Sequence, residues 1–154
     1  MLDGLYARLN ADPVRQLSLT LLRVTTGFLM VWWGLNKIVS TGLSQTISDT
    51  FYGGAFSQAW LLIGFGGLQT ALGALVVLGL LRRVAYLAQF AVNAFTAAAV
   101  WYAILDPFKW YLPPQTEFPF TQLFYPSAII AAASLLLIAF HDQERWALDR
   151  RIGG

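Results

Sequence analysis

Polar side chains that suit a carbonyl-bearing ligand interrupt the apolar stretches of this chain. Trp33, Asn36 and Lys37 place an indole ring, an amide and an ammonium group close together near the end of one stretch. Gln69 and Asn93 add amides near the middle of two later ones. A quinone needs a flat apolar slot and one or two donors that reach its carbonyl oxygens. The candidate ligand-binding residues are therefore Trp33, Asn36, Lys37, Gln69, Asn93, Trp101 and Asp106.

The same residues allow a simpler, structural interpretation. Gln69, Gln89 and Asn93 could form hydrogen bonds between helices, worth about 0.6 kcal/mol each in a membrane. Lys37 could anchor a helix at an interface or pair with Asp106, because both are expected at the same end of their helices.

A second polar set is predicted deeper in the helices. Arg23 and Gln89 lie about 9 Å and 8 Å from the same end of their stretches, if each residue rises 1.5 Å. We therefore expect these two side chains to hydrogen-bond across a bundle. The alternative for Arg23 is that its guanidinium extends to lipid headgroups at the nearer surface.

The sequence contains few residues that suit other kinds of chemistry. The chain has no cysteine and one histidine, so disulfides, thiolate metal sites and a bis-histidine haem within one chain are excluded. His141 and Glu144 are expected on an exposed polar helix end, and no metal site is assigned. No nucleophile elbow, phosphate loop, dinucleotide fingerprint or catalytic carboxylate pair is present, so no catalytic residue is assigned and enzymatic activity stays open. The net charge of +2 does not favour nucleic acid as a partner.

The composition predicts a membrane protein in one domain, 1–154. Hydrophobic residues make up 57% and charged residues 12%, too few charges to cover a water-facing surface. Four stretches, 17–39, 60–81, 84–105 and 121–140, are each long enough to cross a bilayer, which takes about 20 residues. They are apolar all round rather than along one stripe, which disfavours a soluble bundle. We therefore expect an all-α, integral membrane four-helix bundle.

Arginine distribution predicts the orientation of this bundle. Seven arginines fall before the first stretch, between the second and third, or after the fourth: Arg8, Arg15, Arg82, Arg83, Arg145, Arg150 and Arg151. The positive-inside rule then places both termini in the cytoplasm. The opposite connections, 40–59 and 106–123, are long and aromatic, and the first is expected to hold a short interfacial helix ended by Gly53-Gly54. Gly67, Ala71 and Ala74 share a face that we expect to pack against another helix.

Several short motifs resemble those of the DoxX family of bacterial membrane proteins, in matching order from about 17 to 150. They are Gly34-Leu35-Asn36-Lys37, Gln69-Thr70-Ala71-Leu72-Gly73 followed by Gly79 and Arg82-Arg83, Tyr125-Pro126, and Arg145-Trp146-Ala147-Leu148-Asp149. Two positions depart from the family pattern: Trp33 stands where histidine is frequent, and Gln69 where glutamate is frequent. Both replace an ionisable group, which argues against proton transfer or metal binding at these positions.

The resemblance implies a four-helix protein of the bacterial inner membrane, related to the small membrane subunit of a thiosulfate:quinone oxidoreductase. The leading hypothesis is a membrane subunit or accessory of a quinone-linked redox system, with quinone as the candidate cofactor and a membrane or periplasmic redox protein as partner. The alternatives are a non-enzymatic membrane anchor for an assembly partner and, third, a small-molecule transporter. The lipid bilayer is the expected surrounding, and a homo-oligomer is compatible with each hypothesis.

Overall fold

The computed structural model of the chain describes residues 11–106, 108 and 124–152. All regular elements within these ranges are helices, which confirms the predicted all-α class for the described residues. Their bounds are α2 Asp12–Val39, α3 Thr41–Phe51, α4 Ala59–Leu78, α5 Arg82–Ala99, α6 Trp101–Leu105, α7 Tyr125–Ala139 and α8 Leu148–Ile152.

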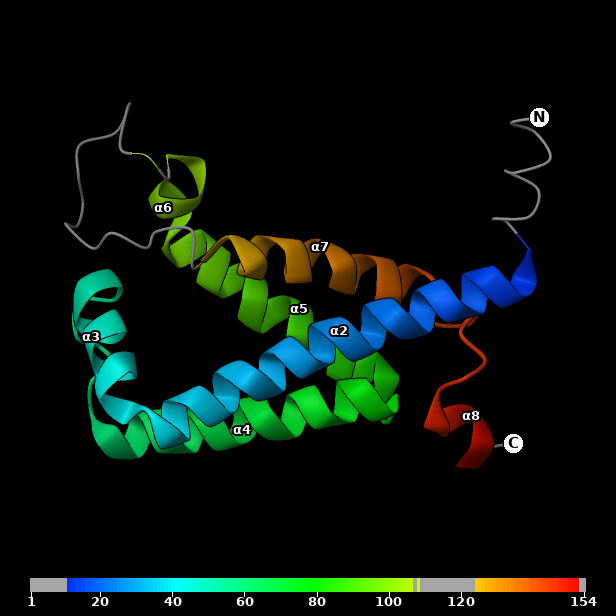
Figure 1. Cartoon of the computed structure of the whole chain (residues 1–154), viewed down its shortest axis with the longest axis horizontal. Coiled ribbons are helices and arrows are strands. Elements are labelled where there is room, and N and C mark those ends of the chain that lie inside the picture. The colour runs from blue at the N-terminus through cyan, green and yellow to red at the C-terminus, as the bar shows by residue number, and fades with distance from the viewer. Residues whose placement is uncertain (1–10, 107, 109–123, 153–154) are drawn as a thin grey trace.

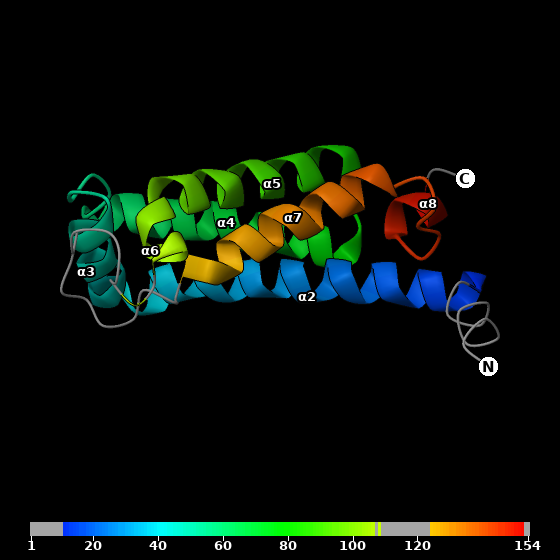
Figure 2. The ribbon, with the colours of Figure 1, turned by 90° about the horizontal axis from the view of Figure 1, so that it is seen from above.

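The long helices form two packed pairs. α2 packs chiefly against α4, and α5 against α7 (Figure 1). α3 and α6 lie at one end of this bundle, whereas α8 and the beginning of α2 lie at the other (Figures 1 and 2). These are called the α3 end and the α8 end below. Both described ends of the chain are therefore at the α8 end, an arrangement compatible with the predicted placement of both termini on one side.

Glycine brings α2 and α4 together. A Cβ atom added at Gly34 would lie 2.7 Å from the carbonyl oxygen of Gly66, and one added at Gly73 would lie 2.7 Å from that of Gly27. These distances leave no room for a side chain, so the two backbones are in direct contact, as small residues allow between apolar helices.

The small residues that were expected to pack do not. Gly67, Ala71 and Ala74 are exposed, and a Cβ at Gly67 would meet open space. That prediction was wrong because the face of α4 that contacts α2 contains Gly66 and Gly73. This face is offset from the predicted one by about one residue, or 100° around the helix axis.

Helix bounds differ from the predicted spans in understandable ways. α2 begins at Asp12, with Pro13 in its first turn, where the missing amide hydrogen of proline costs nothing. α4 ends at Leu78 and is capped by Gly79, whose φ of 69° closes the helix in the left-handed conformation. The third predicted span is two helices, since α5 ends at Ala99 and α6 begins at Trp101, with Val100 between them. Of the fourth, residues 121–123 lie outside the described residues.

The short helix predicted after the first span is present as α3, and Gly53 and Gly54 follow it with positive φ. Its apolar face packs inward. Phe51 lies edge-on to Phe124, with 4.5 Å between ring centroids, and both join a buried cluster with Val100 and Ala103. The predicted aromatic connection 106–123 lies outside the described residues, except for Asp106 and Phe108.

Among the described residues, two helices are long and apolar enough to cross a membrane, α2 and α4, and α7 is a shorter apolar helix. The distribution of exposure is unusual. Large apolar side chains along the helices are exposed, such as Trp32 at 61%, Leu68 at 73% and Phe95 at 63%, whereas Arg23, Gln89 and Glu144 are buried. A single water-soluble chain has the opposite tendency.

Candidate functional site

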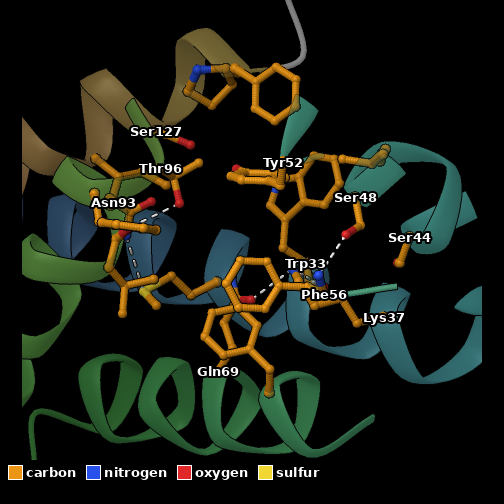
Figure 3. A pocket seen from close by; sticks show the side chains of 18 of the residues that line it. Trp33, Lys37, Ser44, Ser48, Tyr52, Phe56, Gln69, Asn93, Thr96 and Ser127 are labelled. Carbon is orange, nitrogen blue, oxygen red and sulfur yellow. Dashed lines mark hydrogen bonds between the residues drawn. The ribbon is translucent and has the colours of Figure 1, made fainter. Parts of the chain in front are cut away.

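A cavity of about 410 Å³ lies at the α3 end, between α2, α3, α4, α5 and α7 (Figure 3). Its volume is within the range of about 300–1,000 Å³ that is usual for small-molecule sites. Aromatic and aliphatic side chains form most of its wall, including Met30, Trp33, Phe65, Phe124 and Ile130. The polar groups on the wall are few: Lys37, Ser44, Ser48, Tyr52, Gln69, Asn93, Thr96 and Ser127.

Lys37 is the cation of this site. Its Nζ donates to Gln69 Oε1 at 2.9 Å and to the backbone oxygen of Trp33 at 3.3 Å. It also lies 5.8 Å from the ring centroid of Trp33 and 5.5 Å from that of Phe65, within the range of cation–π attraction. An ammonium group has three N–H donors, so one remains for an acceptor oxygen.

The described wall of the cavity holds no carboxylate to balance Lys37. A charge in an apolar cavity is costly without an opposite charge or strong acceptors. Two neutral oxygens and two ring faces compensate only part of this cost. The site is therefore matched to a ligand that brings an electron-rich oxygen.

Asn93 lies on the wall formed by α5. Its amide donates to the backbone oxygen of Gln89 at 2.8 Å and approaches Met30 Sδ at 3.6 Å. Thr96, one turn further along α5, donates to the backbone oxygen of Val92 at 2.9 Å. Both side chains hold fixed positions because they bond to their own helix.

The segment after α3 covers the α3 end of the cavity. The backbone N–H of Phe56 donates to Ser48 Oγ at 3.0 Å, and the rings of Tyr52 and Phe56 meet edge-on with centroids 6.0 Å apart. Burial raises the pKa of Tyr52, and a hydrogen bond with Thr96 opposes that rise only in part. The Tyr52 hydroxyl faces the cavity and is hydrogen-bonded to Thr96.

Four of the seven candidate ligand residues line this cavity: Trp33, Lys37, Gln69 and Asn93. The other three do not. Asn36 lies beside it on α2, Trp101 is exposed on α6, and Asp106 is buried at the end of α6. The predicted pair between Lys37 and Asp106 is not formed, since Lys37 turns towards Gln69 on α4 instead.

Sequence reasoning missed the contribution of α3 and α7. Ser44, Ser48 and Tyr52 enter the cavity because α3 folds back across the end of the bundle, and Ser127 enters from the first turn of α7. The one available signal was the spacing of Ser44 and Ser48, which places both on one helix face with Phe51. All three are buried.

A second polar cluster lies at the α8 end and has a different character. Glu144 is 1% exposed and forms an ion pair with Arg23, with 2.6 Å between Oε1 and Nε. Its other oxygen accepts from the Tyr86 hydroxyl at 2.7 Å and lies 3.7 Å from Arg82 Nη1. Arg23 also donates to the backbone oxygen of Val77 at 2.8 Å. One buried carboxylate thus joins α2, α5 and the segment after α7.

This cluster corrects two predictions. Glu144 does not lie on an exposed helix end, because α7 ends at Ala139 and the following turns fold Glu144 under the bundle. The predicted Arg23–Gln89 hydrogen bond is absent, since Arg23 is occupied by Glu144 and Val77. Gln89 is fully buried, and neither atom of its amide has a hydrogen-bond partner in the part of the chain that the structure describes.

Asp149 completes the α8 end by capping a helix from a distant part of the chain. Its carboxylate accepts from the backbone N–H groups of Leu81 and Arg82, both at 2.9 Å, at the start of α5. Burial acts to raise the pKa of Asp149, but these two hydrogen bonds and the charge of Arg82 outweigh it and hold the pKa below its usual value. Negative charge at a helix N-terminus is stabilising.

The two ends therefore differ in what they can do. Among the described residues, no group of three His, Asp or Glu side chains is placed to hold a metal ion. The α8 end matches its charges internally. The α3 end offers an ammonium donor, a tyrosine hydroxyl and aromatic faces inside an apolar cavity, a combination that can bind a flat molecule with acceptor oxygens.

Comparisons of the chain with protein-family models, with curated proteins and with solved structures gave no match. The resemblance to the DoxX family stays a prediction from short motifs. The structure shows that residues of these motifs meet in space: Lys37 bonds to Gln69, and Asp149 bonds to Arg82.

Proposed function

We propose that the chain is a four-helix protein of the bacterial inner membrane that holds a quinone-class ligand at the α3 end, as a membrane subunit or accessory of a quinone-linked redox system. The membrane part of the proposal is supported by the inverted pattern of exposure. Apolar side chains of α2, α4, α5 and α7 face outward over most of the helix lengths. Exposed apolar surface of this extent indicates a membrane or a protein partner.

The orientation proposed for the bundle has the α8 end in the cytoplasm. Arg15, Arg83, Arg145, Arg150 and Arg151 are exposed there, where anionic headgroups attract them. The α3 end then lies at the outer face. Single cysteines at Asp142, which is exposed at the α8 end, and at Thr46 in this cysteine-free chain would test this with an impermeant thiol reagent in intact spheroplasts. Labelling at Thr46 alone supports the orientation, and labelling at Asp142 contradicts it.

The ligand part of the proposal is carried by one observation: Lys37 stands in an aromatic, mostly apolar cavity whose described wall has no carboxylate. A quinone ring fits between such aromatic faces, and one of its carbonyl oxygens accepts a hydrogen bond from Lys37. When bound, a quinone supplies two-electron redox chemistry. The chain itself binds and orients the ring and excludes water from it, and electrons come from a partner protein.

Lys37→Met tests this assignment because methionine keeps the length of the side chain and removes its charge. We expect purified wild-type protein in mild detergent to retain membrane quinone that mass spectrometry detects, and Lys37→Met to retain at most a tenth of it. Gln69→Glu is a second probe: a carboxylate 2.9 Å from Lys37 Nζ would neutralise it and also lower retention. Equal quinone content in all three proteins would overturn the assignment.

A membrane anchor for an assembly partner is the second candidate. The observation that favours it is the face of Gly67, Ala71 and Ala74 on α4, which is exposed. Small residues of this kind allow another helix to approach closely. Ala71→Trp should then release a co-purifying partner without changing quinone retention, whereas loss of quinone alone would leave the first function in place.

A further inference from the structure

The cavity at the α3 end has a lateral opening between α4 and α5. Four apolar residues that line the cavity are also exposed on the outside of the molecule: Phe56 after α3, Phe65 on α4, and Ala91 and Phe95 on α5. Phe65 is 44% exposed and Phe95 63%. The cavity is not closed on all sides. Because three of these four residues lie on α4 and α5, we place its opening between these two helices.

The opening is on the side of the bundle rather than at its tip. α4 and α5 are joined at the α8 end and separate towards the α3 end (Figure 1). Ala91 lies about 12 Å of helical rise from the end of α5 at Ala99, and Phe65 about 9 Å from the start of α4 at Ala59. In a bundle that crosses the membrane, this depth is below the headgroups and in contact with hydrocarbon.

The tip of the cavity is covered. The segment after α3 is tied back to that helix by the Phe56–Ser48 hydrogen bond and by Gln45, whose Nε2 donates to the backbone oxygen of Ser57 at 2.9 Å. The Tyr52 and Phe56 rings close the space between them. A ligand from the aqueous side would have to displace these contacts, whereas one from the lipid would not.

We infer that the cavity takes its ligand sideways from the lipid phase, and that this ligand is an amphiphile with a long apolar tail. Its acceptor oxygen reaches Lys37 and Gln69 inside the cavity. Its tail leaves between α4 and α5, beside Phe65 and Phe95, and lies along the lipid. This rests on the proposed membrane location and ligand class, and adds which quinones are accepted and by which route.

The test compares two probes on the full chain in lipid nanodiscs: a benzoquinone with a ten-carbon alkyl tail and the same ring without a tail. Binding is the amount retained above that of empty nanodiscs of the same lipid. We expect the tailed quinone to bind saturably and the tailless ring at least tenfold more weakly. Ala91→Trp, which narrows the opening, should lower binding of the tailed quinone at least tenfold.

Ala98→Trp is the matched control, since Ala98 is also exposed on α5 but does not line the cavity. It should bind both probes as the wild type does. If Ala91→Trp does not fold, nitroxide labels on Ala91→Cys and Ala98→Cys replace it. The tailed quinone should then lower oxygen collision at position 91 and leave position 98 unchanged.

Equal binding of the two quinones, together with an unchanged Ala91→Trp, would overturn the lateral route while the proposed quinone site stands. Equal changes in oxygen collision at positions 91 and 98 would also overturn the lateral route. Failure of the wild type to bind either quinone would remove the proposed function, and the lateral route with it.

Discussion

The two ends of the bundle compensate their inner cations in opposite ways, and these cations are buried at the α8 end and half-buried at the α3 end. At the α8 end, Arg23 and Arg82 share Glu144, Tyr86 donates to the same carboxylate, and Asp149 pairs with Arg82. At the α3 end, Lys37 meets an amide oxygen, a backbone oxygen and two aromatic faces. α2 supplies a cation to both ends, so the difference lies in what the neighbouring elements bring to it.

The comparison separates a structural role from a binding role. Charges that the chain neutralises itself have no need of a ligand and hold elements together. A charge that is incompletely compensated inside a cavity lowers the stability of the folded chain. Binding of a ligand with an acceptor oxygen restores that stability. We expect substitutions at the α8 end to change stability and substitutions at Lys37 to change binding.

The largest effect is expected for Glu144→Gln. It leaves two guanidinium groups buried without their carboxylate, and breaking a buried pair in this way costs about 3–5 kcal/mol. The midpoint of thermal unfolding in detergent should fall by more than 10 °C, and the segment after α7 should become sensitive to protease. Asp142→Asn is the control because that side chain is 79% exposed. If both variants unfold at the same temperature, the contacts of Glu144 at the α8 end do not stabilise the fold.

Gly34→Val tests whether the close contact between α2 and α4 stabilises the α3 end. A Cβ at Gly34 would approach Thr70 and the Gly66 carbonyl oxygen, neither of which can move without shifting α4. Overpacking of this kind costs about 1–3 kcal/mol. Thermal unfolding should show this loss, whereas Gly64→Val, at a position with open space, should show much less. Equal losses would mean that the α2–α4 contact is looser than described.

Asp149→Asn should cost about 0.3–1 kcal/mol at neutral pH, because asparagine can still cap the helix but no longer places a negative charge at its N-terminus. The pKa of Asp149 is lower in the folded chain than in the unfolded one, where it is about 3.9. Its contribution is therefore complete above that unfolded pKa and disappears as the pH falls through the lower folded pKa. Unfolding midpoints of wild type and variant should differ at pH 6 and converge as the pH falls through the folded pKa of Asp149. A difference that persists at low pH would exclude the charge as its cause.

Lys37→Met should have the smallest effect on stability, or a slightly favourable one, because it removes a charge that has no carboxylate on the described wall of its cavity. Unfolding of the ligand-free protein would be compared with that of wild type and Glu144→Gln. A loss as large as that of Glu144→Gln would show that the two ends are alike, and would remove the distinction on which the binding role depends.

Much of the architecture followed from local patterns. Apolar runs of helical length, the proline at the start of α2, and the glycines that end α3 and α4 specify helices through neighbouring residues alone. The shared face of Trp33 and Lys37 also depends only on helical periodicity, and both side chains line the cavity at the α3 end.

Contacts between distant segments could not be read in this way. The position of Glu144 depends on where α7 ends and on the turns after it, and nothing near it in the chain indicates that Arg23 is its partner. The rotation of α4 that selects Gly66 rather than Gly67 is set by packing against α2, since periodicity gives two neighbouring faces of similar composition.

Composition and periodicity by themselves determined that this chain forms apolar helices with polar residues along one side, because those properties are local to each helix. Tertiary structure alone decided which polar residues meet: Glu144 with Arg23 and Arg82, Asp149 with the start of α5, and Lys37 with Gln69. The physical reason is that a buried charge is stabilised by the few atoms within about 4 Å of it. Those atoms come from segments whose approach is set by the packing of the whole bundle.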